Sequence, residues 1–316
     1  MAHASTMQPF ARGDIFVGST LLNREDDDHA GDGRIIQYDS NLNEKGVLWT
    51  EGTTHLIGGL AFAPDGTLWA FDSNSYSVIR VSPEGRRLPQ IHFADRAFSN
   101  INFAADGTIY LGEHLVGNTV RLRPGSKLGT TLSKMPGTDL FGHGHLLHFT
   151  QDGKLLKEYA TPVHGGMTSF LGLTSAALRA DGKTILYLSE LSDGIRVYDL
   201  VNDRRLPDFL SYAPDSGQLA ISIMYTSDGR LLHVRAKGRE GFFLDELSEA
   251  GEVLRSYTLP GAGWASMGRS IEKDIVLMGN FFTGEFGKFN LASGEMVARA
   301  ATGTQRSLAG LAQYGG

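Results

Sequence analysis

The sequence contains no cysteine, and only 10 of its 316 residues are proline. Without cysteine the chain has no disulfide and no thiolate, which excludes zinc ribbons, iron–sulfur clusters and cysteine nucleophiles. Any metal ion would therefore be held by histidine, carboxylate, amide or carbonyl ligands.

Long apolar runs and basic clusters are also missing. No apolar run approaches the roughly 20 residues that cross a bilayer, and the first residues lack the basic and apolar stretches of an export signal. The formal net charge is -6, so there is no basic field for a nucleic acid. We expect a cytoplasmic protein that acts on a small molecule, with neither nucleic acid nor membrane as a partner. An export signal that had already been removed would leave no trace.

Glycine, in contrast, is abundant, with 40 residues, or about one in eight against roughly 7% in average proteins. Several glycines follow aspartate in a repeated pattern of a short apolar run, Asp-Gly and a second apolar run. Asp-Gly supplies the positive φ angles of tight hairpin turns, so the pattern predicts hairpins. It occurs four times, with a degenerate fifth copy, in residues 59–71, 100–112, 173–189, 221–234 and 265–280.

Six further hairpin patterns alternate with these copies, giving units of four strands about 40 to 50 residues apart, which is typical of propeller blades. The first unit lacks an inner strand, because 13–19 already matches a second strand, whereas 307–316 matches an inner strand without a partner. We predict an all-β, six-bladed β-propeller over residues 1–316, a single domain whose C-terminal strand completes the first blade and closes the ring. A flat β-sandwich would need neither the even spacing nor the unpaired last strand.

Two links are too long for hairpins, at about residues 19–33 and 113–144. Both fall between the second and third strands of a blade, so they share one rim of the propeller. Long loops in compact domains are usually functional or disordered. We therefore expect these insertions to form a lid over that mouth of the channel.

The same rim should collect the residues that precede inner strands and those that follow second strands. Among them we expect Glu113 and Arg235 to be catalytic, with Arg235 in a small basic cluster suited to a carboxylate substrate. A charged loop tip is the simpler interpretation of that cluster. The expected substrate-binding residues are Asp72, Asn100, Trp264, Asn280 and Arg306.

Three histidines and a carboxylate on this rim suggest a metal site. His55, His114 and His164 with Glu190 would suit a divalent ion such as zinc or iron, with positions left for water or substrate. The ion would lower the pKa of a bound water toward about 7, with Glu113 as the proton acceptor. The alternatives are that the histidines cap loops, or that one or two of them bind substrate without a metal.

A second histidine motif lies in GHGHLLHF. Alternation along an extended segment places His143 and His145 on the same side, where they would chelate a metal or simply mark the edge of a strand.

The segments GLAFAPDGTLWAFDS (59–73) and LTSAALRADGKTILYLSELSDGIRVYDL (173–200) resemble the repeating hairpins of the gluconolactonase / senescence-marker-protein superfamily and the related NHL-type propellers. The resemblance covers nearly the whole chain at the level of the scaffold. It implies a six-bladed propeller with a central-channel site, often for calcium or another divalent ion, in lactonases and organophosphate hydrolases. Asn100 matches one of the strand-head positions that carry the family's metal ligands, whereas Gly58 and Gly172 occupy two others.

We therefore expect a small-molecule enzyme at the channel mouth, and metal-assisted hydrolysis of a lactone or ester is the first hypothesis. A metal-dependent lyase or isomerase on the same scaffold is the second. The third, from a different class, is a propeller that binds a ligand or protein without catalysis.

Overall fold

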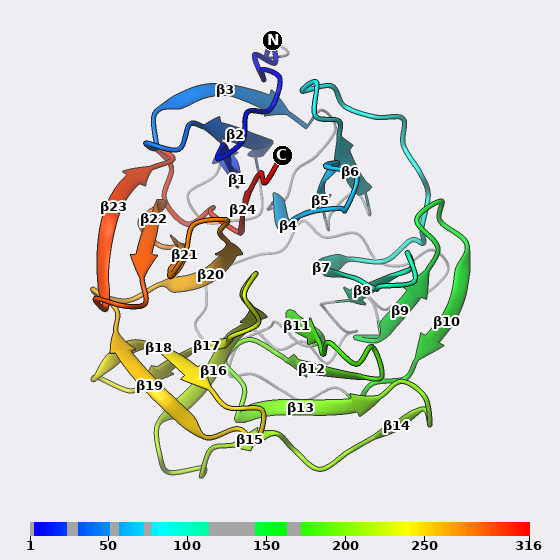
Figure 1. Cartoon of the computed structure of the whole chain (residues 1–316), viewed down its shortest axis with the longest axis vertical. Helices are drawn as coiled ribbons and strands as arrows, with labels where there is room; N and C mark the ends of the chain where they lie inside the picture. Colours follow the sequence, from blue (N-terminus) through cyan, green and yellow to red (C-terminus); the bar gives the residue numbers. More distant parts are fainter. Residues whose placement is uncertain (1–2, 24–30, 51–56, 73–76, 114–142, 163–171) are drawn as a thin grey trace. The chain divides into compact units, whose positions relative to one another are not determined.

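The protein is all-β in its computed structural model, which describes residues 3–23, 31–50, 57–72, 77–113, 143–162 and 172–316. Within these ranges there are 24 strands and no helix, hence none that would cross a membrane. The strands form six antiparallel sheets, the blades of a six-bladed β-propeller, as predicted (Figure 1). The described chain divides into two compact units, one from residues 3–92 and 263–316 and the other from 93–262.

The first unit holds three sheets. In spatial order, their strands are β24 (Gly310–Gln313), β1 (Ile15–Leu22), β2 (Gly31–Tyr38) and β3 (Glu44–Trp49); β4 (Ile57–Phe62), β5 (Leu68–Asp72) and β6 (Ser77–Val81); and β20 (Trp264–Arg269), β21 (Ile275–Asn280), β22 (Glu285–Asn290) and β23 (Glu295–Ala301).

The second unit holds the other three sheets. Their strands, again in spatial order, are β7 (Phe98–Phe103), β8 (Ile109–Glu113), β9 (Leu146–Phe149) and β10 (Leu155–Tyr159); β11 (Ser175–Leu178), β12 (Thr184–Leu188), β13 (Gly194–Asp199) and β14 (Arg204–Arg205), with β15 (Leu210–Ser211) also on β13; and β16 (Gln218–Tyr225), β17 (Leu231–Lys237), β18 (Gly241–Leu247) and β19 (Val253–Thr258).

The C-terminal strand completes the first sheet, which confirms the predicted closure. Strand β24 pairs antiparallel with β1, with Phe16 opposite Ala312 and Gly18 opposite Gly310. Phe16 is fully buried in an apolar cluster that also takes in residues of β4 and β5. The last strand thus belongs to the same packed core as the first.

The Asp-Gly hairpins form where the sequence predicts them. In each of three turns the aspartate Oδ1 accepts the backbone N–H two residues later, at 2.9 Å for Asp65, 3.0 Å for Asp106 and 2.8 Å for Asp181. The glycine that follows each aspartate has a φ between +64° and +84°. Aspartate therefore closes the turn while glycine adopts the left-handed conformation.

Two sheets depart from the predicted four-strand pattern, and both departures involve proline. After β6 a single bridge pairs Val81 with Arg87, and Pro89 follows two residues later. In the β11–β14 sheet the outer strand is split into β14 and β15, with Pro207 between them. Because proline has no N–H to donate, it interrupts the ladder at these outer positions. The first predicted insertion is also shorter than expected, since β1 runs to Leu22 and β2 starts at Gly31.

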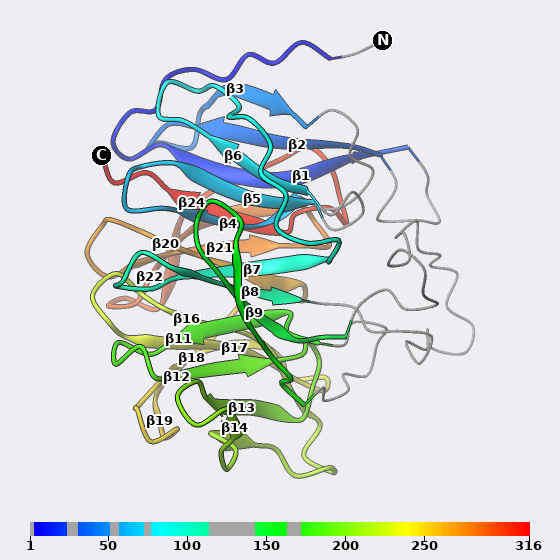
Figure 2. The same cartoon turned by 90° about the vertical axis from the view of Figure 1, so that its right-hand side faces the viewer.

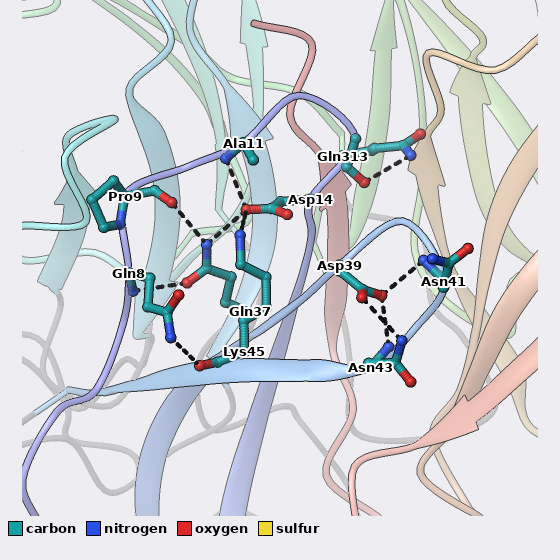
Figure 3. Close-up of polar contacts among 11 residues, drawn as sticks. Gln8, Pro9, Ala11, Asp14, Gln37, Asp39, Asn41, Asn43, Lys45 and Gln313 are labelled. Carbon is teal, nitrogen blue, oxygen red and sulfur yellow. Dashed lines mark hydrogen bonds and ion pairs between the residues drawn. The ribbon is translucent and has the colours of Figure 1, made fainter.

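The N-terminal segment runs alongside β3 and ties it to the strands beneath (Figure 2). The Thr6 N–H donates to the Val47 carbonyl at 2.7 Å, and the Trp49 N–H donates to the Ser5 hydroxyl at 3.0 Å. Buried Asp14 ends this segment, where its Oδ2 accepts Gln37 Nε2 at 2.8 Å and Lys45 Nζ at 2.6 Å (Figure 3).

In the second unit, side chains of inner strands substitute for a backbone ladder between sheets. Asn102 of β7 accepts the Leu178 N–H at 2.9 Å and donates to the Ala176 carbonyl at 3.3 Å. Ser175 of β11 exchanges two such bonds with the backbone of Ile223 in β16, at 3.0 and 3.1 Å. The three inner strands are thus held side by side in order.

A buried imidazole lies in the same unit. His233 is fully buried; its Nδ1–H donates to the Ser222 carbonyl at 2.8 Å, and its Nε2 accepts the Tyr212 hydroxyl at 2.8 Å. Since a carbonyl only accepts, Nδ1 carries the proton and the ring is neutral. Burial lowers the pKa of His233 to about 4.

This pKa makes stability pH-dependent. Between pH 6.5 and 4 the unfolded chain binds a proton at His233, whereas the folded chain does not. The contribution of His233 to the free energy of unfolding is therefore fully present above pH 6.5. It falls by on the order of 3 kcal/mol as the pH is lowered to 4. Urea denaturation at pH 7, 5.5 and 4 measures it. His233→Asn should be less stable at pH 7 but flatter across the range, whereas the exposed His92→Asn should keep the full slope; equal slopes in all three proteins would contradict the assignment.

Candidate functional site

The second strands of the β7–β10 and β11–β14 sheets end in carboxylates. Glu113 is the last residue of β8, and Glu190 follows β12 by two residues. The Leu173 N–H donates to the Glu113 carbonyl at 2.8 Å, which ties the entry of one sheet to the exit of the other. Both glutamates were predicted from their position after a second strand, but their surroundings differ.

The Glu113 carboxylate is saturated with hydrogen bonds. It is fully buried, and its Oε2 accepts three successive backbone N–H groups, of His143, Gly144 and His145, at 3.0 to 3.2 Å. Its Oε1 lies 3.3 Å from Nη1 of Arg96. A carboxylate held by these donors anchors the start of the third strand, which differs from the predicted role as a free proton acceptor.

Arg96 connects Glu113 to a second carboxylate. Its Nη2 lies 3.7 Å from Oε1 of Glu158, and that same oxygen is 2.6 Å from Nδ1 of His145. Neither Arg96 nor Glu158 was predicted from the sequence. Glu158 is on the outer strand β10 and Arg96 precedes the inner strand, so only the pairing of the whole sheet brings them together.

Glu190 lies in a tight turn that is pinned at both ends. The Ser192 N–H donates to the Ser189 carbonyl at 3.1 Å, and the Ala220 N–H of β16 donates to the Ser192 carbonyl at 2.8 Å. The Ser189 hydroxyl donates to the Gly172 carbonyl at 2.5 Å. Glu190 is therefore presented at a fixed place between two inner strands.

The residue after Glu190 is strained. Leu191 has a φ of +60°, at the third position of a turn where a positive φ normally calls for glycine. A leucine in this conformation costs about 1 kcal/mol or more, and such residues concentrate at functional sites. The strained backbone next to the Glu190 carboxyl therefore suggests a functional role for this turn. The sequence alone does not reveal this backbone strain.

Desolvation raises the pKa of Glu190 to about 7. Its side chain is half-buried, and within the described ranges no hydrogen-bonding or charged partner of its carboxyl is present. A carboxyl group that titrates near neutral pH suits general acid–base chemistry. Glu190, predicted as a metal ligand, is thus also a candidate acid or base by itself.

Two other predicted residues of this unit make structural contacts. Arg235 is largely buried within its sheet, with Nε 2.5 Å from Oδ2 of Asp245 and its guanidinium over the Phe243 ring at 4.3 Å. Asn100 donates from Nδ2 to the Leu173 carbonyl at 2.9 Å. The structure therefore brings Asn100 to the entry of β11 and turns Arg235 toward outer strands.

The remaining predicted residues that are described lie in the first unit. Trp264 is fully buried, so a ligand would reach its ring only after the rim rearranged. Asn280 is buried and its Oδ1 accepts the N–H groups of Phe282 and Thr283, which caps the turn after β21. Asp72 is buried at the end of β5, and Arg306 has a φ of +54°.

Sequence reasoning missed Phe282 in this group. This residue is 52% exposed on the turn capped by Asn280. The adjacent pair Phe281-Phe282 after a second strand was the available signal.

The predicted histidine ligands His55, His114 and His164 lie outside the described residues, as do most residues of the second insertion. Among the residues that are described, no group of three or more histidine, aspartate or glutamate side chains is arranged to hold a metal ion. The predicted metal centre stays a prediction.

The strain at Leu191 is testable by substitution. Leu191→Gly and Leu191→Ala lose the same apolar side chain, but only glycine relaxes at positive φ, so the glycine variant should be more stable by about 1 kcal/mol. Chemical denaturation of both variants at pH 7 measures the difference. Alanine being the more stable of the two would show that the turn is not strained.

No protein-family model matches the sequence, and no curated protein sequence matches it. Solved structures do match in fold. One chain of a nidogen/laminin complex is 14% identical over 95% of this chain and 98% of its own, with a TM-score of 0.60. A protein of unknown function from Bacteroides caccae is 12% identical over 96% and 99%, with a TM-score of 0.59.

Virginiamycin B lyase from Staphylococcus aureus is a further match. Its selenomethionine form is 14% identical over 93% of this chain and 90% of its own, with a TM-score of 0.51. The structure of a catalytically inactive histidine-to-alanine variant with quinupristin is 14% identical over 91% of this chain and 84% of its own, with a TM-score of 0.50. At these identities the matches show the propeller fold, and they do not confirm the predicted likeness to gluconolactonases.

Proposed function

We propose that the protein is a small-molecule enzyme in which Glu190 performs acid–base catalysis of a lyase-type elimination. The observation that carries the proposal is the Glu190 carboxyl, which is desolvated, has a pKa near 7 and is fixed in a strained turn. A group with this pKa is partly in each protonation state at neutral pH, so it both takes up and releases protons readily.

Elimination requires from the protein mainly a group that acts first as a base and then as an acid. The Glu190 carboxylate would remove a proton from the carbon next to a carbonyl. The C–H electron pair forms a C=C bond while the bond to the leaving oxygen breaks. Glu190, now protonated, returns its proton to the leaving group or to water. The hydrogen bonds of Ser189 and Ser192 hold the backbone of the turn that carries Glu190 in place during both transfers.

The fold neighbours support an enzyme on this scaffold. Virginiamycin B lyase is, by its name, a lyase. Its two structures match this chain with TM-scores of 0.50 and 0.51, which indicates a common propeller fold. Fold likeness does not transfer function, so the choice of elimination for this chain depends on Glu190.

Metal-assisted hydrolysis of a lactone or ester is the second candidate. In it, Glu190 and the histidines His55, His114 and His164 would hold zinc, iron or calcium, and a bound water would be the nucleophile. A half-buried carboxyl without a charged partner in the described ranges is also a fitting oxygen ligand for such an ion.

Turnover in water labelled with ¹⁸O separates the two reactions. We expect a panel of lactones and cyclic depsipeptides, quinupristin included, to give products that contain a new C=C bond and no ¹⁸O, as mass spectrometry and ultraviolet absorbance would show. One ¹⁸O per product, together with one divalent ion per chain that is lost in His55→Ala or His164→Ala, would establish hydrolysis instead. Ligand binding without turnover, intact after substitution of all three histidines, would identify a binding protein.

Glu190→Gln tests the carboxyl directly. Because the base form is needed, kcat/KM of the unaltered protein should rise with pH through about 7, and the variant should lose at least about 100-fold at pH 8 together with that rise. Glu240→Gln, on an exposed carboxylate paired with Lys237, is the matched control and should keep both. A Glu190→Gln variant with the original rate and profile would overturn the proposal.

A further inference from the structure

The His143 and His145 imidazoles lie together just before β9. Their ring centroids are 5.3 Å apart and their planes 26° from parallel. Gly144 between them has a φ of +75°, so the backbone turns here and is not the extended segment that the sequence predicts. The ring contact itself shows that the two imidazoles lie side by side. This pair plays no part in the proposed chemistry of Glu190.

His145 is oriented by a carboxylate. Its Nδ1 is 2.6 Å from Oε1 of Glu158, and Arg96 approaches that oxygen at 3.7 Å. An ionised carboxylate only accepts hydrogen bonds, so Nδ1 carries a proton, and in the neutral ring Nε2 is then the nitrogen with the lone pair. A carboxylate on one ring nitrogen with the other nitrogen left as a donor of electrons is the usual arrangement around a metal-ligating histidine.

The backbone of the pair is fixed as well. The N–H groups of His143, Gly144 and His145 all donate to Oε2 of Glu113, and Arg96 spans Glu113 and Glu158. Both the main chain and the His145 ring are therefore positioned by carboxylates that share one guanidinium. The His145 side chain is 25% exposed, so an ion would reach it from solvent.

We propose that His143 and His145 form a two-imidazole chelate for a borderline divalent ion such as zinc, with Glu158 and Arg96 as positioning residues. Imidazole nitrogens suit zinc, copper and nickel, whereas calcium and magnesium prefer oxygen ligands. Two protein ligands leave the other coordination positions to water or an exogenous ligand. The chelate does not include Glu190, and the proposal does not depend on the proposed function.

Calorimetric titration of the metal-free full chain with Zn²⁺ tests the site. The background carries His3→Asn, since a histidine near the start of the chain would add a site of its own. We expect one saturable site, with affinity at least 10-fold lower in both His143→Asn and His145→Asn. Glu158→Leu should weaken binding by about 10-fold, and Glu158→Gln, which keeps an acceptor for Nδ1, should restore part of the loss.

Two matched controls distinguish this site from its neighbours. His148→Asn should leave Zn²⁺ binding unchanged, because the His148 Nε2 is bonded to the Thr108 hydroxyl and its ring stacks on Tyr110. Glu190→Gln should also leave it unchanged, whereas a second Zn²⁺ site lost in that variant would belong to the metal hydrolase alternative. Circular dichroism checks that each variant is folded. Absence of Zn²⁺ binding, or binding that survives both His143→Asn and His145→Asn, would overturn the proposal.

Discussion

The first sheet exists because the two ends of the chain meet within it. Two glycines let this sheet approach β4 closely: a Cβ on Gly18 of β1 would come within 2.1 Å of the Ile57 carbonyl oxygen, and one on Gly310 of β24 within 3.0 Å of the Gly59 nitrogen. Gln313 then secures the closed strand, accepting Ser270 Oγ at 2.7 Å and donating to the Gly13 carbonyl at 3.1 Å. Without the last strand, β1 and β4 would lose the apolar cover on which the first unit is built.

Within the second unit, the carboxylates at or just after the ends of two second strands have opposite roles. Glu113 is surrounded by donors, so its charge is neutralised and its oxygens are occupied. Glu190 is desolvated, and no described residue compensates for this with a hydrogen bond or a charge. Its pKa is therefore raised to about 7, and the carboxyl is partly protonated at neutral pH. The difference lies in the neighbours, and it separates a carboxylate that holds the fold from one that is available for chemistry.

Much of the fold follows from local rules. The Asp-Gly spacing located the inner hairpins, and the unpartnered last segment predicted the closure. The outer strands interrupted near Pro89 and Pro207 were mispredicted because apolar alternation indicates a strand even where a proline lacks the N–H to pair it. For the site, position after a strand was enough to select Glu190. It did not find Arg96 or Glu158, whose partners lie 17 and 13 residues away along the chain, nor did it show that Trp264 and Arg235 turn away from solvent.

The segment before Asp14 has a consequence for how the protein behaves in concentrated solution. An outer strand with unpaired amides and carbonyls is a template for another chain, and natural proteins shield such edges. In this protein Ser5 and Thr6 occupy the free groups of Val47 and Trp49 along β3. A change that detached these few residues would expose the backbone groups of β3 as an edge strand open to pairing with another chain. The short N-terminal segment thus protects the molecule against aggregation.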